Sequence, residues 1–407
     1  MKKYTIILLV SLLMALILVA GVNWMVNPFD IFDSPEYEKF NKYKPAAARQ
    51  ARINKIYQVK KQKPDYIILG TSRALALPDD YLVPVNMRGF NLALASSSIY
   101  EQLRMFQHAH AINKQKRVVI GIDESLSISV QQNFSEDRIA VTVDGDKNSG
   151  WSYVVMQDVL NRLFSLDALR ASYKTVKNQP KESIEHLLKQ DKIKRVYGAG
   201  GHKQMFLTME ASVLKNFPGA GGSSCYKSGQ MHGEDNGVAM SYFKAMLELA
   251  YSDDVEFYIF FSPVHARIYE TWCVGGLWGV IENTKREIVT MVEQIAELYG
   301  KQPFPIWDFS GYNIITTEPV PEFGDRQTLM YGYWEGSHYT HAVARLILER
   351  MFEEKTVLPA DFGVMITSDN IEQHLQKIHQ QHLKYLQNNP DDIEEIISLV
   401  SGKNINR

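Results

Sequence analysis

Cysteine is scarce in this chain of 407 residues, which contains only Cys225 and Cys273. Two cysteines are too few for a disulfide scaffold or a cysteine-rich metal site. Neither sign of charge dominates, since 44 Lys and Arg residues face 46 Asp and Glu residues, and this balance gives no electrostatic reason to expect a nucleic-acid partner. Repeats with the period of a solenoid or a propeller are also absent. With 45% apolar and 22% charged residues, the composition is that of a globular protein and excludes a disordered chain.

One long uncharged run lies at the N-terminus. Residues 4–26 carry no charged side chain and follow Lys2 and Lys3. As a helix this run is about 34 Å long, enough to cross a hydrocarbon core of about 30 Å. We interpret residues 1–28 as a signal anchor whose transmembrane helix Pro28 ends. A cleaved signal peptide and a buried core helix are the alternatives.

The charges beside this run predict its orientation in the membrane. Because positively charged flanks stay in the cytoplasm, Lys2 and Lys3 predict that the rest of the chain is exported. We therefore expect a single-pass protein of the inner (cytoplasmic) membrane, with its C-terminal domain in the periplasm or elsewhere on the extracytoplasmic side. In an oxidising compartment Cys225 and Cys273 could pair. Two free thiols are the alternative, because sequence does not give the distance between them.

The exported part alternates short apolar runs with helical patterns, which predicts an α/β domain over residues 46–355. Runs this short and continuous are typical of strands that are buried on both faces of a sheet. The runs are residues 66–69, 90–94, 118–122, 257–261 and 305–307. We therefore expect a parallel sheet with helices on both faces.

Helix signals and interruptions complete this outline. Capping boxes at residues 98–101 and 284–287 predict two helix starts, and Gly300 predicts where the second helix ends. Apolar residues after His338 predict the last helix of the domain. Residues 125–237 break the alternation, so we expect an insertion of helices and long loops that helps to shape a substrate cleft.

The C-terminal residues 360–407 form a polar tail with a helical pattern. It contains His374, His379 and His382, which do not share one helix face. We therefore expect a solvated helix rather than a metal site. No metal, nucleotide or other cofactor is implied elsewhere in the chain.

Two motifs carry candidate catalytic groups. The first apolar run ends in Gly-Thr-Ser-Arg at residues 70–73, and Trp-Glu-Gly-Ser-His at residues 334–338 precedes the last helix. A serine at the carboxyl end of a buried parallel strand, entering a helix, lies where open α/β sheets bind ligands, and the helix N-terminus can hold an oxyanion. Ser72 could act as nucleophile, with His338 as its base and Glu335 orienting the imidazole. In the alternative interpretation, Ser72 caps a helix and His338 makes a hydrogen bond within a loop.

Four short motifs at successive strand ends resemble the SGNH (GDSL-type) hydrolases. They are Gly70-Thr71-Ser72, Asn91 to Ser96, Asp123, and Glu335-x-x-His338. The resemblance implies a flavodoxin-like three-layer α/β/α sandwich that cleaves or transfers acyl esters through a Ser–His–Asp triad. The membrane-anchored layout further resembles exported relatives such as the alginate O-acetylation proteins and the teichoic acid D-alanylation protein DltD. It implies a serine esterase or O-acyltransferase that moves an acetyl group on a cell-envelope glycan, with the glycan or an acyl-donor protein as partner.

Residue by residue, the resemblance makes Ser72 the nucleophile and its N–H a first oxyanion donor, with His338 as general base. Glu335 stands where the family has Asp, and Ser96 stands where it has a Gly that donates a backbone N–H. Asp123 lies near the family's amide-donating Asn, and a carboxylate cannot donate unless it is protonated. The site therefore recruits another donor or is slow. The alternative function is a non-catalytic scaffold of the same fold that binds a glycan or a partner of an envelope-assembly system.

Five further residues are candidates for the same site. Asn91 or Ser97 could replace the missing oxyanion donor. Asp308 ends the last apolar run and is a rival for the triad acid, or else it caps a turn. Arg73 could contact a phosphate or carboxylate of a polymer, or pair with a nearby acid. His265 could face the cleft, or it could start a helix.

Overall fold

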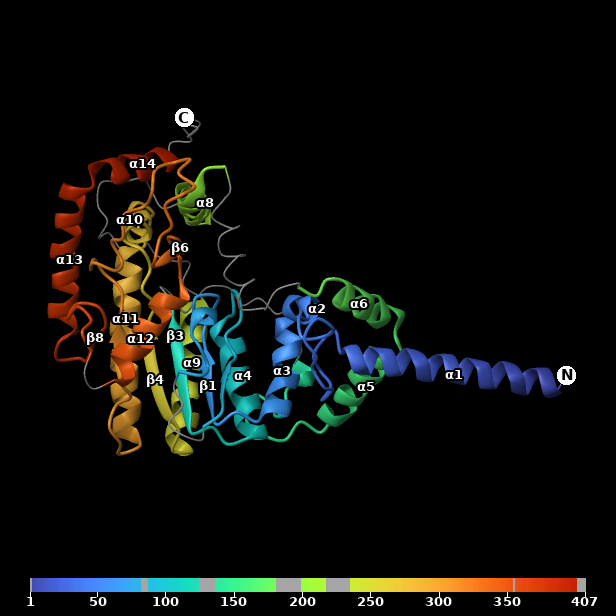
Figure 1. The fold of residues 1–407 in the computed structure, drawn as a ribbon. Coiled ribbons are helices and arrows are strands. Elements are labelled where there is room, and N and C mark those ends of the chain that lie inside the picture. Colours follow the sequence, from blue (N-terminus) through green and yellow to red (C-terminus); the bar gives the residue numbers. More distant parts are fainter. Residues whose placement is uncertain are drawn as a thin grey trace. The chain divides into compact units, whose positions relative to one another are not determined.

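The computed structural model describes residues 2–81, 87–123, 136–180, 199–216, 235–353 and 356–400. The chain divides into two compact units (Figure 1). Unit 1 comprises residues 1–63, 107–114 and 132–192, and unit 2 comprises residues 64–106, 115–131 and 193–407. The predicted insertion at 125–237 is therefore divided, because its described residues 136–180 belong to unit 1 and its described residues 199–216 to unit 2.

Unit 2 is built on a six-stranded sheet with the strand order β2-β1-β3-β4-β5-β8. The strands are β1 (Tyr66–Leu69), β2 (Gly89–Asn91), β3 (Arg117–Ile122), β4 (Glu256–Phe261), β5 (Ile306–Asp308) and β8 (Val364–Met365). The first five are parallel, and only β8 pairs in the antiparallel direction. The five predicted strands and the α/β class with a mostly parallel sheet are therefore confirmed.

Helices pack on both faces of this sheet, as predicted. Tyr66 and Phe260 belong to a buried cluster that includes the apolar face of α12 (His341–Phe352). Phe257 points to the other face, where its ring centroid lies 6.1 Å from that of Phe106 on α4 (Ile99–Ile112). Each buried side chain of this size stabilises the fold by about 1.5–3 kcal/mol. Apolar side chains of the sheet are thus buried against helices on both of its faces.

The two predicted capping boxes have different outcomes. At the start of α4, the Ser98 hydroxyl accepts from the Glu101 N–H at 3.2 Å and the Glu101 carboxylate accepts from the Ser98 N–H at 3.1 Å, so the first box is confirmed. The second is wrong, because α11 (Trp278–Leu298) begins before it and the Thr284 hydroxyl donates to the Val280 carbonyl inside the helix. Gly300 follows the end of α11 with a φ of +61°, as its sequence position predicted.

Unit 2 contains further helices and a second, smaller pair of strands. They are η1 (Ala74–Ala76), α8 (Gly201–Asn216), α9 (Asp235–Ser252), α10 (Ala266–Val274), β6 (Tyr333–Glu335), β7 (His338–Tyr339), α13 (Ile371–Asn388) and α14 (Pro390–Val400). Strands β6 and β7 form a separate antiparallel pair in which Glu335 lies opposite His338.

The expectation of a solvated tail helix is wrong. Helix α13 buries Leu375, Ile378, His382 and Tyr385, which recur at helical spacing. The His382 imidazole lies 2.9 Å from the Glu270 carboxylate. The composition of the tail is mostly polar and therefore predicts a solvated helix. A few apolar residues on one face are nevertheless enough to bury that face.

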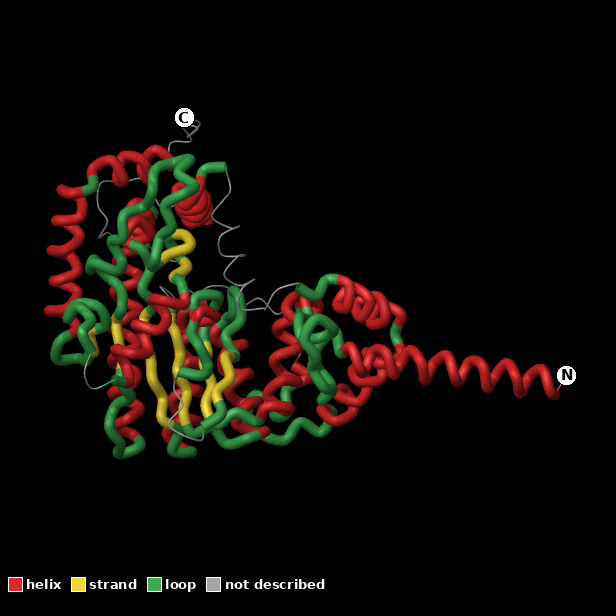
Figure 2. The backbone as a smooth tube through the Cα atoms, viewed as in Figure 1, coloured by secondary structure: helices red, strands yellow, loops and turns green. Residues whose placement is uncertain are grey.

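Unit 1 is helical in its described part (Figure 2). Its helices are α1 (Lys2–Val26), α2 (Pro45–Arg49), α3 (Ala51–Gln62), η2 (Glu136–Arg138), α5 (Trp151–Phe164) and α6 (Leu166–Lys177). Helix α1 ends before Asn27, as predicted, and it is long and apolar enough to span a membrane.

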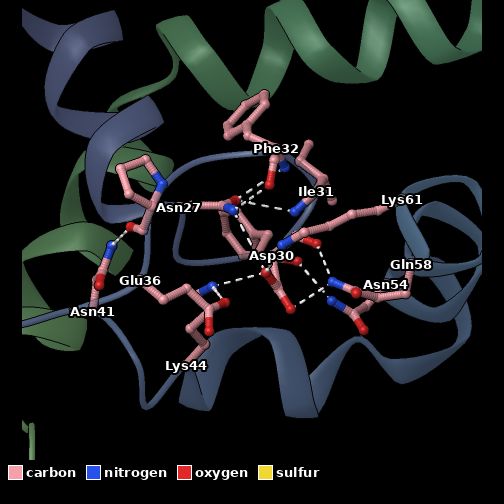
Figure 3. A network of polar contacts seen from close by, with 12 residues as sticks. Asn27, Asp30, Ile31, Phe32, Glu36, Asn41, Lys44, Asn54, Gln58 and Lys61 are labelled. Atoms are coloured by element: carbon pink, nitrogen blue, oxygen red, sulfur yellow. Dashed lines mark hydrogen bonds and ion pairs between the residues drawn. The ribbon is translucent and has the colours of Figure 1, made fainter. Parts of the chain in front are cut away.

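Side-chain hydrogen bonds hold the loop that follows α1 (Figure 3). The Asn27 amide donates to the Phe32 carbonyl at 2.8 Å. Asp30 accepts from the Lys44 ammonium at 2.8 Å, and Asn41 donates to the Met25 carbonyl in the last turn of α1 at 2.8 Å. The loop is therefore attached to the end of α1 and not only joined to it by the chain.

Candidate functional site

The turn after β1 needs the glycine at position 70. Gly70 has a φ of +137°, and a Cβ there would lie 2.7 Å from the Ala74 Cβ and 3.0 Å from the Gly121 carbonyl oxygen. This close approach places Ser72 directly beyond the carboxyl end of β1. The α-helix expected after Ser72 is wrong, because only the short 3₁₀ turn η1 follows it. A helix dipole therefore does not act on this serine.

Ser72, His338 and Glu335 form a hydrogen-bonded chain. The Ser72 Oγ lies 2.7 Å from the His338 Nε2, and the His338 Nδ1 contacts the Glu335 carboxylate. The second carboxylate oxygen accepts from the Ser337 N–H at 2.8 Å. The side chain of His338 is 34% exposed, whereas that of Glu335 is 8% exposed. The imidazole is thus accessible from solvent, while the carboxylate that contacts it is shielded from water.

Arg73 connects the serine turn to the histidine hairpin. Its guanidinium donates to the Ser337 carbonyl at 2.9 Å and to the Ser337 hydroxyl at 2.7 Å. It also pairs with Asp123 at 3.1 Å, and Asp123 accepts from the Thr71 and Ser262 hydroxyls. Arg73 is buried and pairs with a nearby acid, which is one of the two interpretations that the sequence allows. Asp123 in turn serves as an acceptor for groups on both sides of Ser72.

Asn91 supports the 3₁₀ turn η1. Its amide nitrogen donates to the carbonyls of Ala74 and Leu77, both at 2.9 Å, and its oxygen accepts from the Ala93 N–H. Both amide hydrogens are therefore engaged by the protein and do not point at a ligand.

The turn after β2 is held against Gly70. The Ser97 hydroxyl donates to the Gly70 carbonyl at 2.9 Å, and the Leu94 N–H donates to the same oxygen at 3.0 Å. Ser96 lies in this turn with a φ of +52°, the left-handed region that favours glycine.

Asp308 lies in a different network from His338. Its carboxylate accepts from the Lys285 ammonium at 2.6 Å and contacts the His374 Nε2 at 2.9 Å. Burial alone would raise the pKa of Asp308, but Lys285 and His374 hold it well below its usual value. Of the two acids considered from sequence, Glu335 is the one that contacts the imidazole.

His265 caps α10 and does not face a cleft. Its Nδ1 accepts from the Arg267 N–H at 3.2 Å, and its Nε2 lies 2.7 Å from the Glu318 carbonyl, to which it donates. The side chain is buried, and this burial lowers the pKa of His265 to about 4. The neutral ring is therefore the folded form, and the helix-start interpretation of this residue holds.

This assignment predicts an acid-dependent loss of stability. The folded pKa of His265 lies below the unfolded value of about 6.5, so its contribution is complete above pH 6.5 and is lost as the pH falls toward 4. We expect about 2 kcal/mol of unfolding free energy to be lost through this group between pH 7 and pH 5, measured from urea unfolding. In His265→Asn, whose amide oxygen can still cap the helix, this part of the decline should disappear. An equal decline in both proteins would contradict the assignment.

One cluster has the residue types of a metal site. Among the described residues, the possible ligand atoms of Glu270, Cys273 and His382 lie within 4.8 Å of one another. Cys273 is disulfide-bonded, however, so its sulfur is not the thiolate that a metal would need. Cys225, the other cysteine of the chain, lies outside the described residues.

No protein-family model and no curated protein matches the chain. No residue role is therefore transferred from a relative by alignment. The roles of Ser72, His338 and Glu335 have to be argued from their geometry. Sequence reasoning missed Ser337 and Ser262, which are distant in sequence from Arg73 and Asp123 and which no local signal connects to them.

Proposed function

We propose that this protein is a membrane-anchored, exported serine esterase or O-acyltransferase that acts on an acetylated cell-envelope glycan. The observation that carries the proposal is the hydrogen-bonded chain from the Ser72 hydroxyl through the His338 ring to the Glu335 carboxylate. The acetyl group and the glycan come from the resemblance of the sequence motifs to exported SGNH hydrolases.

In the proposed reaction the Ser72 Oγ attacks the ester carbonyl carbon while its proton passes to the His338 Nε2. The Glu335 carboxylate stabilises the imidazolium that forms. The tetrahedral intermediate collapses, and His338 gives the proton to the leaving alcohol. Water then attacks the acyl-Ser72 in hydrolysis, or a glycan hydroxyl attacks it in transfer, and His338 again takes the proton. The second tetrahedral intermediate collapses with cleavage of the bond to the Ser72 Oγ, and His338 returns the proton to that oxygen as the acid or the acylated glycan leaves.

We assign the binding of the oxyanion to two backbone N–H groups, those of Ser72 and Ser96. The Ser72 N–H has no acceptor within the described part of the chain. Ser96 occupies the family's glycine position, and its φ of +52° is the conformation that glycine would favour there. The turn that contains Ser96 is hydrogen-bonded to Gly70, which lies two residues before Ser72. This agreement between motif and backbone supports Ser72 and Ser96 as the two donors.

The topology supports a flavodoxin-like three-layer sandwich. The strand order β2-β1-β3-β4-β5 is the order of doubly wound flavodoxin-like sheets. In such sheets ligands bind where the order reverses, which here is between the carboxyl ends of β1 and β3. Ser72 follows β1 at that point.

Labelling with a fluorophosphonate tests the proposal, because such probes react with activated serines. Wild-type protein in detergent should be labelled and should hydrolyse an aryl acetate, whereas Ser72→Ala should lose both properties. Ser241→Ala removes an exposed serine of α9 and is the matched control, which should behave as wild type. A wild-type chain that is neither labelled nor active would contradict the proposal.

The second candidate is a non-catalytic protein of the same fold that binds a glycan or an assembly partner. The contacts of Asp123 favour it. This residue lies near the position where SGNH hydrolases have an Asn that donates to the oxyanion. In this chain its carboxylate is the acceptor in all three contacts described, with Arg73, Thr71 and Ser262. Losing one such donor costs about 10²–10³ in rate. The absence of labelling, combined with glycan binding that survives Ser72→Ala, would favour this candidate.

A further inference from the structure

The exposed face of α5 is unusual for a helix outside a membrane. Its exposed residues are Ser152, Tyr153, Met156, Gln157, Leu160, Asn161 and Phe164. None of them is charged, and the four large apolar side chains recur at helical spacing in one stripe. We call Tyr153, Met156, Leu160 and Phe164, with the adjoining Leu166 of α6, the apolar stripe. Its side chains are between 43% and 65% exposed.

The charged residues of the same helix point inward. Asp158 accepts from Arg138 at 2.6 Å and from the Tyr57 hydroxyl at 2.5 Å. The Arg162 guanidinium lies 4.0 Å from the centre of the Phe29 ring. A helix that turns its charges toward the protein and its apolar side chains outward is reversed relative to a helix that faces water. The pattern is that of a surface covered by lipid or by another apolar partner.

The position of α1 decides between these partners. Residues 2–18 of α1 are exposed, whereas Asn23 and Val26 near its end are buried. The uncharged part of the exposed stretch, residues 4–18, gives about 22 Å of helix, shorter than a hydrocarbon core of about 30 Å. If α1 spans the membrane, the outer edge of the hydrocarbon therefore reaches its last two turns. Those turns are the ones that α5 and α6 cover, since Asn23 donates to the Leu163 carbonyl at 2.8 Å and accepts from the Ser172 hydroxyl at 3.0 Å.

The contacts of Asn23 place the α5–α6 connection at that edge. Phe164 and Leu166 flank Ser165, whose carbonyl also accepts from the Asn23 amide. A polar side chain at this depth is stable only when its hydrogen bonds are satisfied inside the protein, and those of Asn23 are. Figure 1 shows α5 and α6 beside the same end of α1. The loop that follows α1 is held at the same end, since Asn41 donates to the Met25 carbonyl in the last turn of α1.

We propose that the apolar stripe lies in the outer interface of the bilayer that α1 spans, as a second and monotopic membrane contact. The occupant is lipid: acyl chains and glycerol at the level of Phe164 and Leu166, and headgroups farther along α5. Unit 1 is then attached to the membrane at two places, which prevents it from turning about the axis of α1. The proposal rests on α1 spanning the membrane and not on the chemistry of Ser72.

Photo-crosslinking from the lipid tests this proposal. The full-length chain is placed in phosphatidylethanolamine and phosphatidylglycerol nanodiscs that contain a lipid with a diazirine in its acyl chain. After illumination, adducts should appear on the peptides of α1 and on the peptide with residues 153–166. Adducts on α1 alone would overturn the proposal. The absence of adducts on α1 would remove its premise, and fluorophosphonate labelling of Ser72 would be unaffected by either result.

Substitutions then show whether the stripe itself makes the contact. In Phe164→Ser/Leu166→Ser, lipid adducts on residues 153–166 should fall to background while those on α1 persist. Both side chains are exposed, so their loss leaves the fold intact. Val238→Ser, at an exposed apolar position of α9, is the control and should leave all adduct yields unchanged. Adducts on residues 153–166 that persist in the double variant would overturn the proposal.

Discussion

Replacing His338 with alanine should slow the acylation of Ser72 by about 10⁴-fold or more, measured as the rate of fluorophosphonate labelling or of aryl acetate hydrolysis. The Ser72 hydroxyl loses the acceptor that lies 2.7 Å from it, so no group takes its proton in the transition state. Because His338 is partly exposed and lies at the end of a short hairpin, its removal should leave the unfolding midpoint close to that of wild type.

Substitutions at Glu335 separate orientation from proton transfer. Glu335→Gln keeps an oxygen near the His338 Nδ1 but loses the negative charge, and we expect a decrease of about 10²–10⁴-fold in the same rates. Glu335→Asp restores the charge and carries the residue type of the SGNH hydrolases that the motifs resemble, and it should recover part of the activity. Equal rates for wild type and Glu335→Gln would show that this carboxylate does not support the base.

Replacing Lys285 with methionine should destabilise unit 2 by about 3–5 kcal/mol. Lys285 and Asp308 are both buried, with 3% and 0% of their side chains exposed, so the substitution leaves a carboxylate without its ammonium partner in the interior. The Lys285 ammonium and His374 hold the pKa of Asp308 below its usual value, although burial alone would raise it. Loss of the ammonium should therefore favour protonation of the Asp308 carboxylate. Urea unfolding of the full chain at pH 7 measures the effect.

Two variants check this interpretation of the Lys285 contact. Lys244→Met removes an ammonium from an exposed i,i+4 pair with Glu248 and should cost less than about 0.5 kcal/mol. The double variant Lys285→Met/Asp308→Asn removes both charges and should regain part of the stability. A Lys285→Met protein as stable as Lys244→Met would mean that the buried pair does not stabilise the fold.

The sheet and the positions of the candidate residues at its edge could be predicted from the sequence, because both depend on local patterns. Continuous apolar runs identified β1 to β5, whereas β8, with two residues, is too short to produce a pattern. The resemblance of the motifs to SGNH hydrolases, more than their spacing, predicted that Ser72 and His338 are neighbours, and they are. The proposed roles of these two residues remain predictions until chemistry tests them.

Features that depend on tertiary contacts were not predictable in the same way. The bond from Arg73 to Ser337 joins residues far apart in sequence, and neither residue carries a signal of the other. Likewise, nothing local indicates that α5 and α6, from the predicted insertion, pack on the end of α1 through Asn23. Helix α13 was misjudged because its composition is polar although one of its faces is buried.

Mass spectrometry of the fluorophosphonate-treated protein shows whether Ser72 is the nucleophile. We expect a single phosphonyl group per chain, on the peptide that contains Ser72, with none formed in His338→Ala over the same time. An adduct on a different serine, or a folded wild-type chain that remains unmodified, would contradict this assignment.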